Sequence, residues 1–426
     1  MRAFDTDVFF PASSEKSAPR FLQWPFVRVF LQGRIGVSIF SLVTGYVCAL
    51  KPIRQARSGN IEGALVGIAK SAFRRIPRIV LPTTIATCIT WFLCQFGVFQ
   101  IAKHTNSAWL SYTAPAMTPY FGNAVRSLWF NIIETWVHGR NIYDPNHWNL
   151  QPLLKGSMLV YVSVFATIYM QPKYRMMTSL AQWVYYYIGG DCKPSLTSSF
   201  NSEANKNIKA AFGMQLFFGM FLADLSNHAP IQQWASARPW TRTTLSPILL
   251  VLGLFLASYP EDHAEWSTWS LRLKIFSKYI LPEGFDTPRY FTAFGLELIT
   301  LSIHFSPRLK DLLSNRYFLW LGKNSFGVYL IHGMLIRWIL TWCFYGITIP
   351  APVQNEKLEW RPGPNLKLRG PWVQIICYPP WFLLLYSLAH LWIEYVDPLC
   401  ARWTVAIEKY VWATNEKAPA ASPLPH

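Results

Sequence analysis

A single histidine, His332, lies in the middle of an apolar segment that covers residues 317–346. An imidazole inside a membrane helix is costly unless it faces a polar cavity or a partner, so it is a candidate functional group. The small residues Ser325, Gly327 and Gly333 would let other backbones pack closely against this segment. A simpler alternative remains open, in which His332 only hydrogen-bonds to a neighbouring helix.

A cluster of arginines precedes another apolar run, residues 79–99. Arg74, Arg75 and Arg78 surround Pro77, and proline is favoured in the first turn of a helix because its missing N–H would be unpaired there. We therefore expect a helix to begin at Pro77, with Arg75 and Arg78 on one face. Two guanidiniums at a helix N-terminus suit a phosphate or pyrophosphate. The alternative is that these arginines only meet lipid headgroups on the cytosolic side.

Other polar groups in the apolar runs give weaker signals. Asp224 and Glu394 stand close to segment ends, where we expect solvated or ion-paired carboxylates. His390 lies about one helical turn before Glu394, so a local pair is as good an explanation as a catalytic one. The seven cysteines show no CxxC and no regular spacing, so we predict neither a zinc site nor a disulfide framework.

The composition indicates a membrane protein. Of 426 residues, 52% are apolar and only 14% are charged, against roughly 25% charged in an ordinary soluble domain. The 20 Trp and 20 Tyr suit the interface between hydrocarbon and headgroups. The net charge of +17 comes from short basic clusters between apolar runs, which is typical of membrane topology. We therefore expect an all-α, polytopic membrane helix bundle that does not bind nucleic acid.

We predict about nine transmembrane helices, a number good to one or two because several segments are short. The chain then divides into a polar N-terminal segment (1–32), a transmembrane domain (33–397) and a partly disordered C-terminal tail (398–426). The apolar segments are 33–50, 79–99, 156–171, 177–189, 209–226, 244–258, 291–305, 317–346 and 371–396.

The basic clusters predict the orientation. The cluster between the first two segments favours the cytosol, and alternation along the chain puts the later short basic loops on the same side. The longer stretches 100–155, 259–290 and 347–370 fall on the opposite face. The same orientation puts the amino terminus on the lumenal or extracellular side, although no cleavable signal peptide precedes it. An endomembrane, such as the endoplasmic reticulum, or the plasma membrane would hold such a chain.

Four short motifs follow one another along the chain: GRIGVSIFSLVTGYVCALKP (33–52), FRRIPRIVLP (73–82), FFGMFLADL (217–225) and LGKNSFGVYLIHG (321–333). In this order they resemble the acyltransferase 3 family of membrane O-acyltransferases, and its fungal branch in particular. Each motif is loose, but their order makes the set fairly specific. The resemblance extends over about residues 21–397.

The resemblance implies transfer of an acyl group, commonly acetyl, from a coenzyme A thioester to a hydroxyl on a sugar, lipid or small molecule. Arg74, Arg75 and Arg78 would bind the donor phosphates, and His332 would be the catalytic residue on the acceptor path. The expected partners are acyl-CoA, a hydroxyl-bearing acceptor and the lipid bilayer, with no permanently bound cofactor and no metal. Fungal relatives also suggest a role in secondary metabolism.

The chain departs from the family pattern in two places. Family members usually begin with one more membrane helix that carries an Arg and a catalytic His, and residues 1–32 contain no His. Leu153, within residues 148–157, stands where the family has a Glu. Several alternatives follow: an inactive relative that acts as a scaffold or binds lipid, catalysis through His332 or a partner subunit, or a gene model that starts too late. A transporter is a further alternative.

Overall fold

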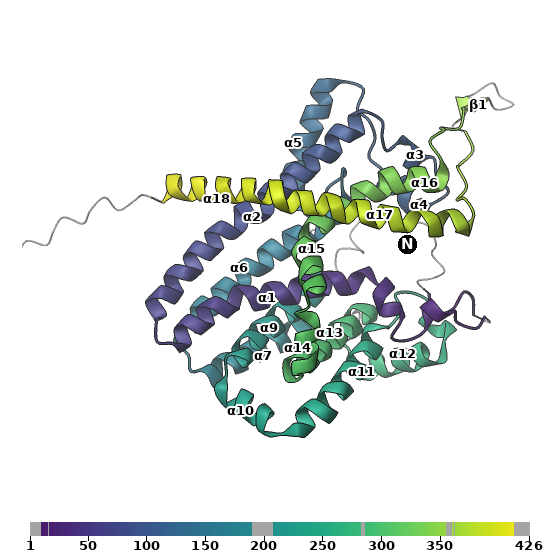
Figure 1. Ribbon diagram of the computed structural model, residues 1–426. Coiled ribbons are helices and arrows are strands. Elements are labelled where there is room, and N and C mark those ends of the chain that lie inside the picture. The colour runs from purple at the N-terminus through teal and green to yellow at the C-terminus, as the bar shows by residue number, and fades with distance from the viewer. Residues whose placement is uncertain are drawn as a thin grey trace, which may run out of the picture.

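The computed structural model describes residues 10–15, 17–189, 208–282, 286–354, 360–361 and 363–412. These residues are almost entirely helical (Figure 1). The α-helices are α1 Gly33–Arg57, α2 Ile61–Gln95, α3 Gln100–Lys103, α4 Ala108–Thr113, α5 Phe121–Val137, α6 Leu150–Thr167, α7 Pro172–Ile188, α9 Ile208–Ser226, α10 Ala229–Ala237, α11 Ser246–Ala257, α12 Thr268–Ile280, α13 Thr287–Phe305, α14 Pro307–Leu313, α15 Arg316–Leu335, α16 Thr341–Tyr345, α17 Pro371–Leu391 and α18 Asp397–Val411.

Short turns complete the fold. Two π-helical turns continue α15 into α16 and α17 into α18, a third leads into α11, and two-residue strands β1 and β2 pair antiparallel. The short elements are η2 Phe21–Gln23, η3 Arg28–Leu31, η4 Pro145–Asn149, η5 Thr241–Leu245, η6 Ala264–Trp266, η7 Ile336–Leu340, η8 Trp392–Val396, β1 Val353–Gln354 and β2 Trp360–Arg361.

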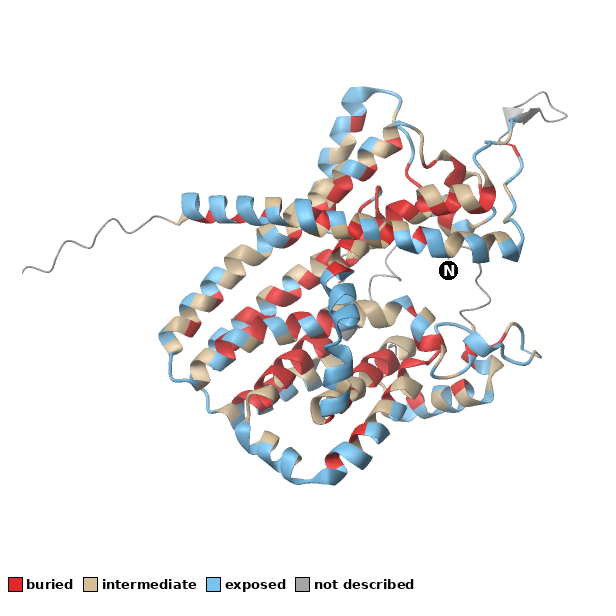
Figure 2. Ribbon diagram, viewed as in Figure 1, coloured by how far each residue is buried: buried red, intermediate tan, exposed pale blue. Residues whose placement is uncertain are grey.

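Helix α9 forms the centre of the molecule, where it lies beside α1, α6 and α7 (Figure 1). Buried residues gather on these helices (Figure 2). A Cβ on Gly45 would lie 2.0 Å from the Leu216 carbonyl oxygen, and one on Gly219 would lie 2.2 Å from that of Leu42. The two glycines therefore let α1 and α9 touch backbone to backbone, as small residues do between membrane helices.

Small residues also bring α15 close to its neighbours. A Cβ on Gly327 would lie 3.2 Å from the Ala389 carbonyl oxygen of α17, and one on Gly333 would lie 2.1 Å from the Asn146 side chain. The expected close approach of another backbone is confirmed at Gly327, whereas at Gly333 the close neighbours are the side chains of Asn146 and Asp144. The expectation is wrong for Ser325, which is exposed and donates a hydrogen bond to the Gly322 carbonyl of its own helix.

Every one of the nine apolar segments lies on a helix, but nine membrane spans are not confirmed. Among the described residues, four helices are long and apolar enough to cross a membrane, or up to five if the bent pair 229–237 and 241–257 counts as one span. The helical bend in that pair is 89°. Helix α11 has only 12 residues, and α7 begins with Lys173 and Arg175, so segment length and charge argue against separate crossings. The fold class, an all-helical bundle with membrane-spanning helices, is confirmed.

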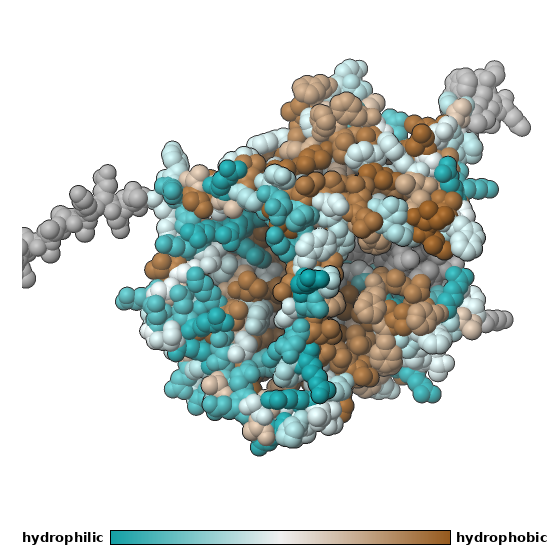
Figure 3. Space-filling view, in the orientation of Figure 1, coloured by the Kyte–Doolittle hydropathy of each residue, from teal (hydrophilic) through white to brown (hydrophobic). Residues whose placement is uncertain are grey.

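The surface agrees with a membrane location. In the space-filling view, apolar side chains cover much of the middle and right of the visible face, over α17 and α11 (Figure 3). Hydrophilic side chains gather on the left, over the turn between α1 and α2. This turn belongs to the basic stretch that the sequence places in the cytosol.

Helix α2 does not begin at Pro77. Its first residue is Ile61, and the Asn60 side chain caps it by accepting a hydrogen bond of 2.8 Å from the Gly63 N–H. Residues 61–76, which are more polar than the apolar run that follows, are already helical. Pro77 therefore lies inside the helix. Arg75 and Arg78 are therefore not at a helix N-terminus, and the expected contribution of that terminus to anion binding is wrong.

The two terminal segments are attached to the bundle. In the N-terminal segment, the Gln32 side chain donates to the carbonyls of Ser258 at 3.2 Å and Tyr259 at 2.8 Å. Within the C-terminal tail, 398–411 belongs to α18, which packs on α2 and continues the line of α17 across it (Figure 1). The disorder expected for the last residues concerns 413–426, which lie outside the described residues.

Candidate functional site

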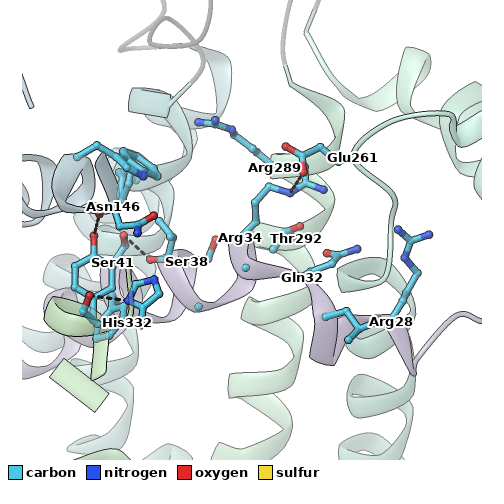
Figure 4. A pocket seen from close by; sticks show the side chains of 18 of the residues that line it. Arg28, Gln32, Arg34, Ser38, Ser41, Asn146, Glu261, Arg289, Thr292 and His332 are labelled. Carbon is cyan, nitrogen blue, oxygen red and sulfur yellow. Dashed lines mark hydrogen bonds and ion pairs between the residues drawn. The ribbon is translucent and has the colours of Figure 1, made fainter. Parts of the chain in front are cut away.

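A cavity of about 560 Å³ lies between the start of α1, the N-terminal segment, η4 and α15 (Figure 4). Its lining combines aromatic rings with polar and charged groups, as is usual for sites that bind small molecules. The lining residues are Arg28, Leu31, Gln32, Gly33, Arg34, Gly36, Val37, Ser38, Phe40, Ser41, Trp109, Asn146, Trp148, Phe212, Glu261, Arg289, Thr292, Tyr329, His332 and Ile336.

His332 lines this cavity, as expected for a histidine in a membrane helix. Its Nδ1 atom lies 2.8 Å from the Tyr329 carbonyl oxygen and 3.2 Å from that of Val328. A carbonyl can only accept, so Nδ1 carries the proton and Nε2 can accept one. The Tyr329 hydroxyl in turn donates to the Asn146 carbonyl, which connects α15 to η4. The geometry thus gives the imidazole one fixed tautomer.

A buried ion-pair cluster supports the wall of the cavity behind His332. Arg337 lies 2.9 Å from Asp144 and donates to the carbonyls of Gly333 and Thr113, each at 3.0 Å. His147 Nε2 lies 3.2 Å from the Leu330 carbonyl and 3.8 Å from Asp144. The side chains of Asp144, His147 and Arg337 are fully buried. Together they attach the loop before α6 to α15 and η7.

Opposing effects set the protonation of this cluster. Burial opposes ionisation of Asp144, but Arg337, His147 and His332 outweigh it and hold the pKa of Asp144 below its usual value. Burial also lowers the pKa of His147, and the attraction of Asp144 does not fully offset this effect. The cluster therefore favours an ionised aspartate beside a neutral His147.

This buried cluster was not predicted, although the sequence contains one signal for it. Arg337 stands in the apolar segment 317–346, where a guanidinium needs an acidic partner. The partner, Asp144, comes from a distant part of the chain, so the sequence pattern alone could not identify it.

The structure separates the three arginines of the basic cluster. Arg74 forms a bidentate pair with Glu408 of α18, with N–O distances of 2.6 and 3.0 Å. Arg75 instead points toward α1, where its Nη2 lies 3.3 Å from the Thr44 hydroxyl, and Arg78 is exposed. Phosphate binding by all three stays a prediction. The geometry favours Arg75 and Arg78 for it, because Arg74 already has an acidic partner.

Helix α1 connects the arginines to the cavity. Ser38 and Ser41 line the cavity, and Thr44 contacts Arg75. Residues three or four apart lie on one face of a helix, so Ser41 and Thr44 are neighbours, about 4.5 Å apart along the axis. Arg75 is therefore about one helical turn away from the cavity lining.

Asp224 and Glu394, the two carboxylates near the ends of apolar segments, differ in their burial. Asp224 is fully buried and pairs with Arg57 and Arg175, which confirms an ion-paired carboxylate and excludes a solvated one. Glu394 is half exposed and lies 3.7 Å from Lys323, which confirms an ion-paired interfacial carboxylate. Its partner is thus Lys323, on α15, rather than the His390 we had considered.

Leu153, at the position where the resembling family has a Glu, is buried in α6. Its aliphatic side chain cannot exchange a proton. In the described part of the chain, no three His, Cys, Asp or Glu side chains gather as metal ligands.

The described residues thus combine four or five candidate membrane-spanning helices with a cavity that has a mixed polar and aromatic lining. A family model described as an acyltransferase domain matches residues 7–391, and the chain therefore belongs to the acyltransferase 3 family. It is 23% identical over 360 residues to the O-acetyltransferase PaAT-1 of Phomopsis amygdali. That match covers 78% of this chain and 66% of the relative's length. No solved structure matches the chain.

Proposed function

We propose that this protein transfers an acyl group, most simply acetyl, from acyl-CoA to a hydroxyl of a small molecule, sugar or lipid. The position of His332 carries the proposal: an imidazole with a fixed tautomer lines a cavity that is one helical turn from Arg75. Membership of the acyltransferase 3 family and the likeness to an O-acetyltransferase support it. A role in secondary metabolism, in an endomembrane or the plasma membrane, is part of the proposal.

In the proposed reaction, His332 is the general base. The acceptor oxygen attacks the thioester carbonyl carbon while its proton passes to Nε2 of His332. The carbon–sulfur bond then breaks, and the thiolate of coenzyme A takes up that proton. The products are an acyl ester and free coenzyme A. Arg75 and Arg78 would hold the donor phosphates, since guanidinium groups bind phosphate with charge-assisted hydrogen bonds.

A second candidate function has one observation in its favour. Leu153 is buried and apolar at the position where the sequence resemblance predicts a Glu, which could have exchanged a proton. A catalytically inactive relative that binds lipid or scaffolds other membrane proteins would tolerate this replacement. Such a protein could keep the donor site but would not transfer the acyl group.

The test is acetyl transfer from radiolabelled acetyl-CoA to a panel of hydroxyl acceptors by the purified full chain in detergent. We expect His332→Gln to lower kcat by at least about 100-fold, the usual contribution of a general base. The double variant Arg75→Gln/Arg78→Gln should raise the KM for acetyl-CoA by about tenfold or more with a smaller change in kcat.

Two matched control variants remove a histidine and an arginine that lie outside the proposed site. His138→Gln changes an exposed histidine that pairs with Glu134, and Arg242→Gln changes an exposed arginine. Both should keep wild-type kinetics. Acetyl-CoA binding without transfer to any acceptor would favour the inactive relative. If neither binding nor transfer occurs, the enzyme proposal is wrong.

A further inference from the structure

Two cysteines, Cys343 of α16 and Cys377 of α17, lie next to each other where these helices pack. Helix α16 lies against α17 near the stretch 347–370 that separates them in the sequence (Figure 1). The residue after each cysteine carries a ring, and the ring centroids of Phe344 and Tyr378 are 5.2 Å apart. The two thiols themselves are close enough to share a hydrogen bond. The fold thus brings together two cysteines that no local pattern connects.

The surroundings of the two thiols are both ordered and accessible. Cys343 and Cys377 pack against the same hydrophobic core cluster as Leu330 and Ile331, the two residues before His332 in α15. Both cysteines are only half-buried, and both are free thiols in the structure. A half-buried thiol can be reached by an oxidant, because oxidation of cysteine depends on its exposure.

The backbone on both sides of the pair is held in place. The Arg369 N–H, just before α17, donates to the Phe344 carbonyl of α16 at 3.2 Å. The Tyr345 hydroxyl donates to the Asn106 side-chain oxygen at 2.9 Å, and the Asn106 N–H donates to the Leu366 carbonyl at 2.9 Å. Two cysteines can be bridged only where the backbone brings them together, and these contacts hold the ends of α16 and α17 in that arrangement.

The side of the membrane determines whether such a pair is oxidised. The sequence predicts that the stretch 347–370 lies on the face opposite the cytosol. Cys343 stands two residues before the end of α16, and Cys377 stands six residues after the start of α17, which is about 9 Å along that helix. Both therefore lie near the lumenal or extracellular face, where disulfides form and persist.

We propose that Cys343 and Cys377 form a disulfide bond at the base of the stretch 347–370. Each thiol loses a proton as the sulfur–sulfur bond forms, and two electrons pass to a disulfide oxidant of that compartment, which is reduced to two thiols. The bond joins α17 to the end of the continuous helix that carries His332 and Arg337. It does not depend on the proposed acyl transfer.

The first test is mass spectrometry of the full chain, purified from the membranes of a yeast host. Cells are lysed in N-ethylmaleimide, which blocks free thiols, and the protein is digested with trypsin without reductant. Cleavage after lysine and arginine places Cys343 in the peptide 338–357 and Cys377 in the peptide 370–402. We expect most molecules to yield these two peptides joined, and the joined species to disappear after reduction.

One control is needed to identify the partner of Cys343. Cys400 lies in the same tryptic peptide as Cys377, but it belongs to α18 and is buried. Cys400→Ser should therefore keep the joined peptides, whereas Cys377→Ser should lose them.

The second test is thermal unfolding in detergent, with and without a phosphine reductant. A disulfide restricts the unfolded chain, so reductant should lower the Tm of wild type by about 3 °C or more. Cys343→Ala, Cys377→Ala and the double variant should all be insensitive to reductant. Cys88→Ala removes another half-buried cysteine, from α2, and should keep the wild-type response to reductant.

Three results would overturn the inference. The first is N-ethylmaleimide on both Cys343 and Cys377 in most molecules, which would make them an ordinary pair of small apolar residues. The second is a joined species that survives in Cys377→Ser. The third is the same response to reductant in Cys343→Ala as in wild type. Because no acyl transfer is measured, each result judges the disulfide whether or not the protein is an enzyme.

Discussion

Asp224 and Asp144 are both fully buried, and each pairs with arginine from other helices, but their surroundings differ. Asp224 lies at the end of α9 and accepts hydrogen bonds from Arg57 of α1 and Arg175 of α7. Asp144 lies in the loop before α6, with Arg337 as its one arginine partner. The first cluster joins three helix ends, whereas the second adjoins the wall of the cavity.

The difference lies in how completely each carboxylate is bonded. Both oxygens of Asp224 accept hydrogen bonds from guanidinium groups. In Asp144, Oδ1 is bonded, but Oδ2 has no hydrogen-bond partner in the structure and lies 3.8 Å from His147. A fully bonded cluster stabilises one packing, while a partly bonded one beside a cavity can respond to protonation or to a ligand. We infer a purely structural role for Asp224 and a role in positioning His332 for Asp144.

The largest effect is expected for Asp224→Asn. The substitution leaves Arg57 and Arg175 without the negative charge that both of them contact, and breaking a buried ion pair costs about 3–5 kcal/mol. Little folded protein should be recovered in detergent, and thermal unfolding should show a large loss of stability. A variant that melts within a few degrees of wild type would contradict a structural role for this cluster.

A smaller loss of stability, about 3 kcal/mol, is expected for Asp144→Asn, because only one arginine loses its partner. Removing both charges in Asp144→Asn/Arg337→Gln should recover most of the unfolding free energy. Acetyl transfer should nevertheless stay at least tenfold below wild type, since the loop and α15 no longer hold His332 as before. If activity returns together with stability, Asp144 has no positioning role.

The sequence predicts helices better than it predicts where they begin or which residues meet. All nine apolar segments are helical, because a chain in lipid must bond its backbone polar groups internally, and this holds even where Pro82, Pro379 and Pro380 lie inside a helix. The start of α2 was mispredicted, since its polar first half continues the helix before the apolar run. Helices α5 and α12 lie in the stretches 100–155 and 259–290, where their charged residues conceal them from a search for apolar segments.

The same distinction applies to the candidate site. A histidine in an apolar segment is expected to face a polar cavity or a partner, and His332 does line the cavity, while its catalytic role stays a prediction. Arg337 and Asp144 form their pair across nearly half of the chain, and no local pattern links them. The lining of the cavity likewise comes from elements that only the tertiary structure brings together.

Acid should destabilise the cluster at Asp144. His147 has a lowered pKa in the folded protein and an ordinary one, about 6.5, when unfolded, so below pH 6.5 the unfolded chain binds a proton that the folded chain does not. Stability therefore falls as the pH falls, by up to about 1.4 kcal/mol per pH unit for this one group. The lowered pKa of Asp144 adds to the loss below about pH 4.

The measurement is thermal unfolding in detergent between pH 5 and pH 7.5, for wild type and His147→Asn. The variant should lose less stability than wild type over this range, because other titrating groups act on both proteins equally. Parallel curves for the two proteins would show that His147 does not sense pH.

The smallest effect is expected for Glu394→Gln, which serves as the reference for both clusters. Glu394 and Lys323 lie 3.7 Å apart, with side-chain exposures of 50% and 57%, so water and salt screen their attraction. The substitution should change the unfolding free energy by less than about 0.5 kcal/mol and leave acetyl transfer at the wild-type level. A loss comparable with that of Asp144→Asn would mean that unfolding in detergent responds to any removed carboxylate. The contrast between buried and exposed ion pairs would then not explain the stability of this bundle.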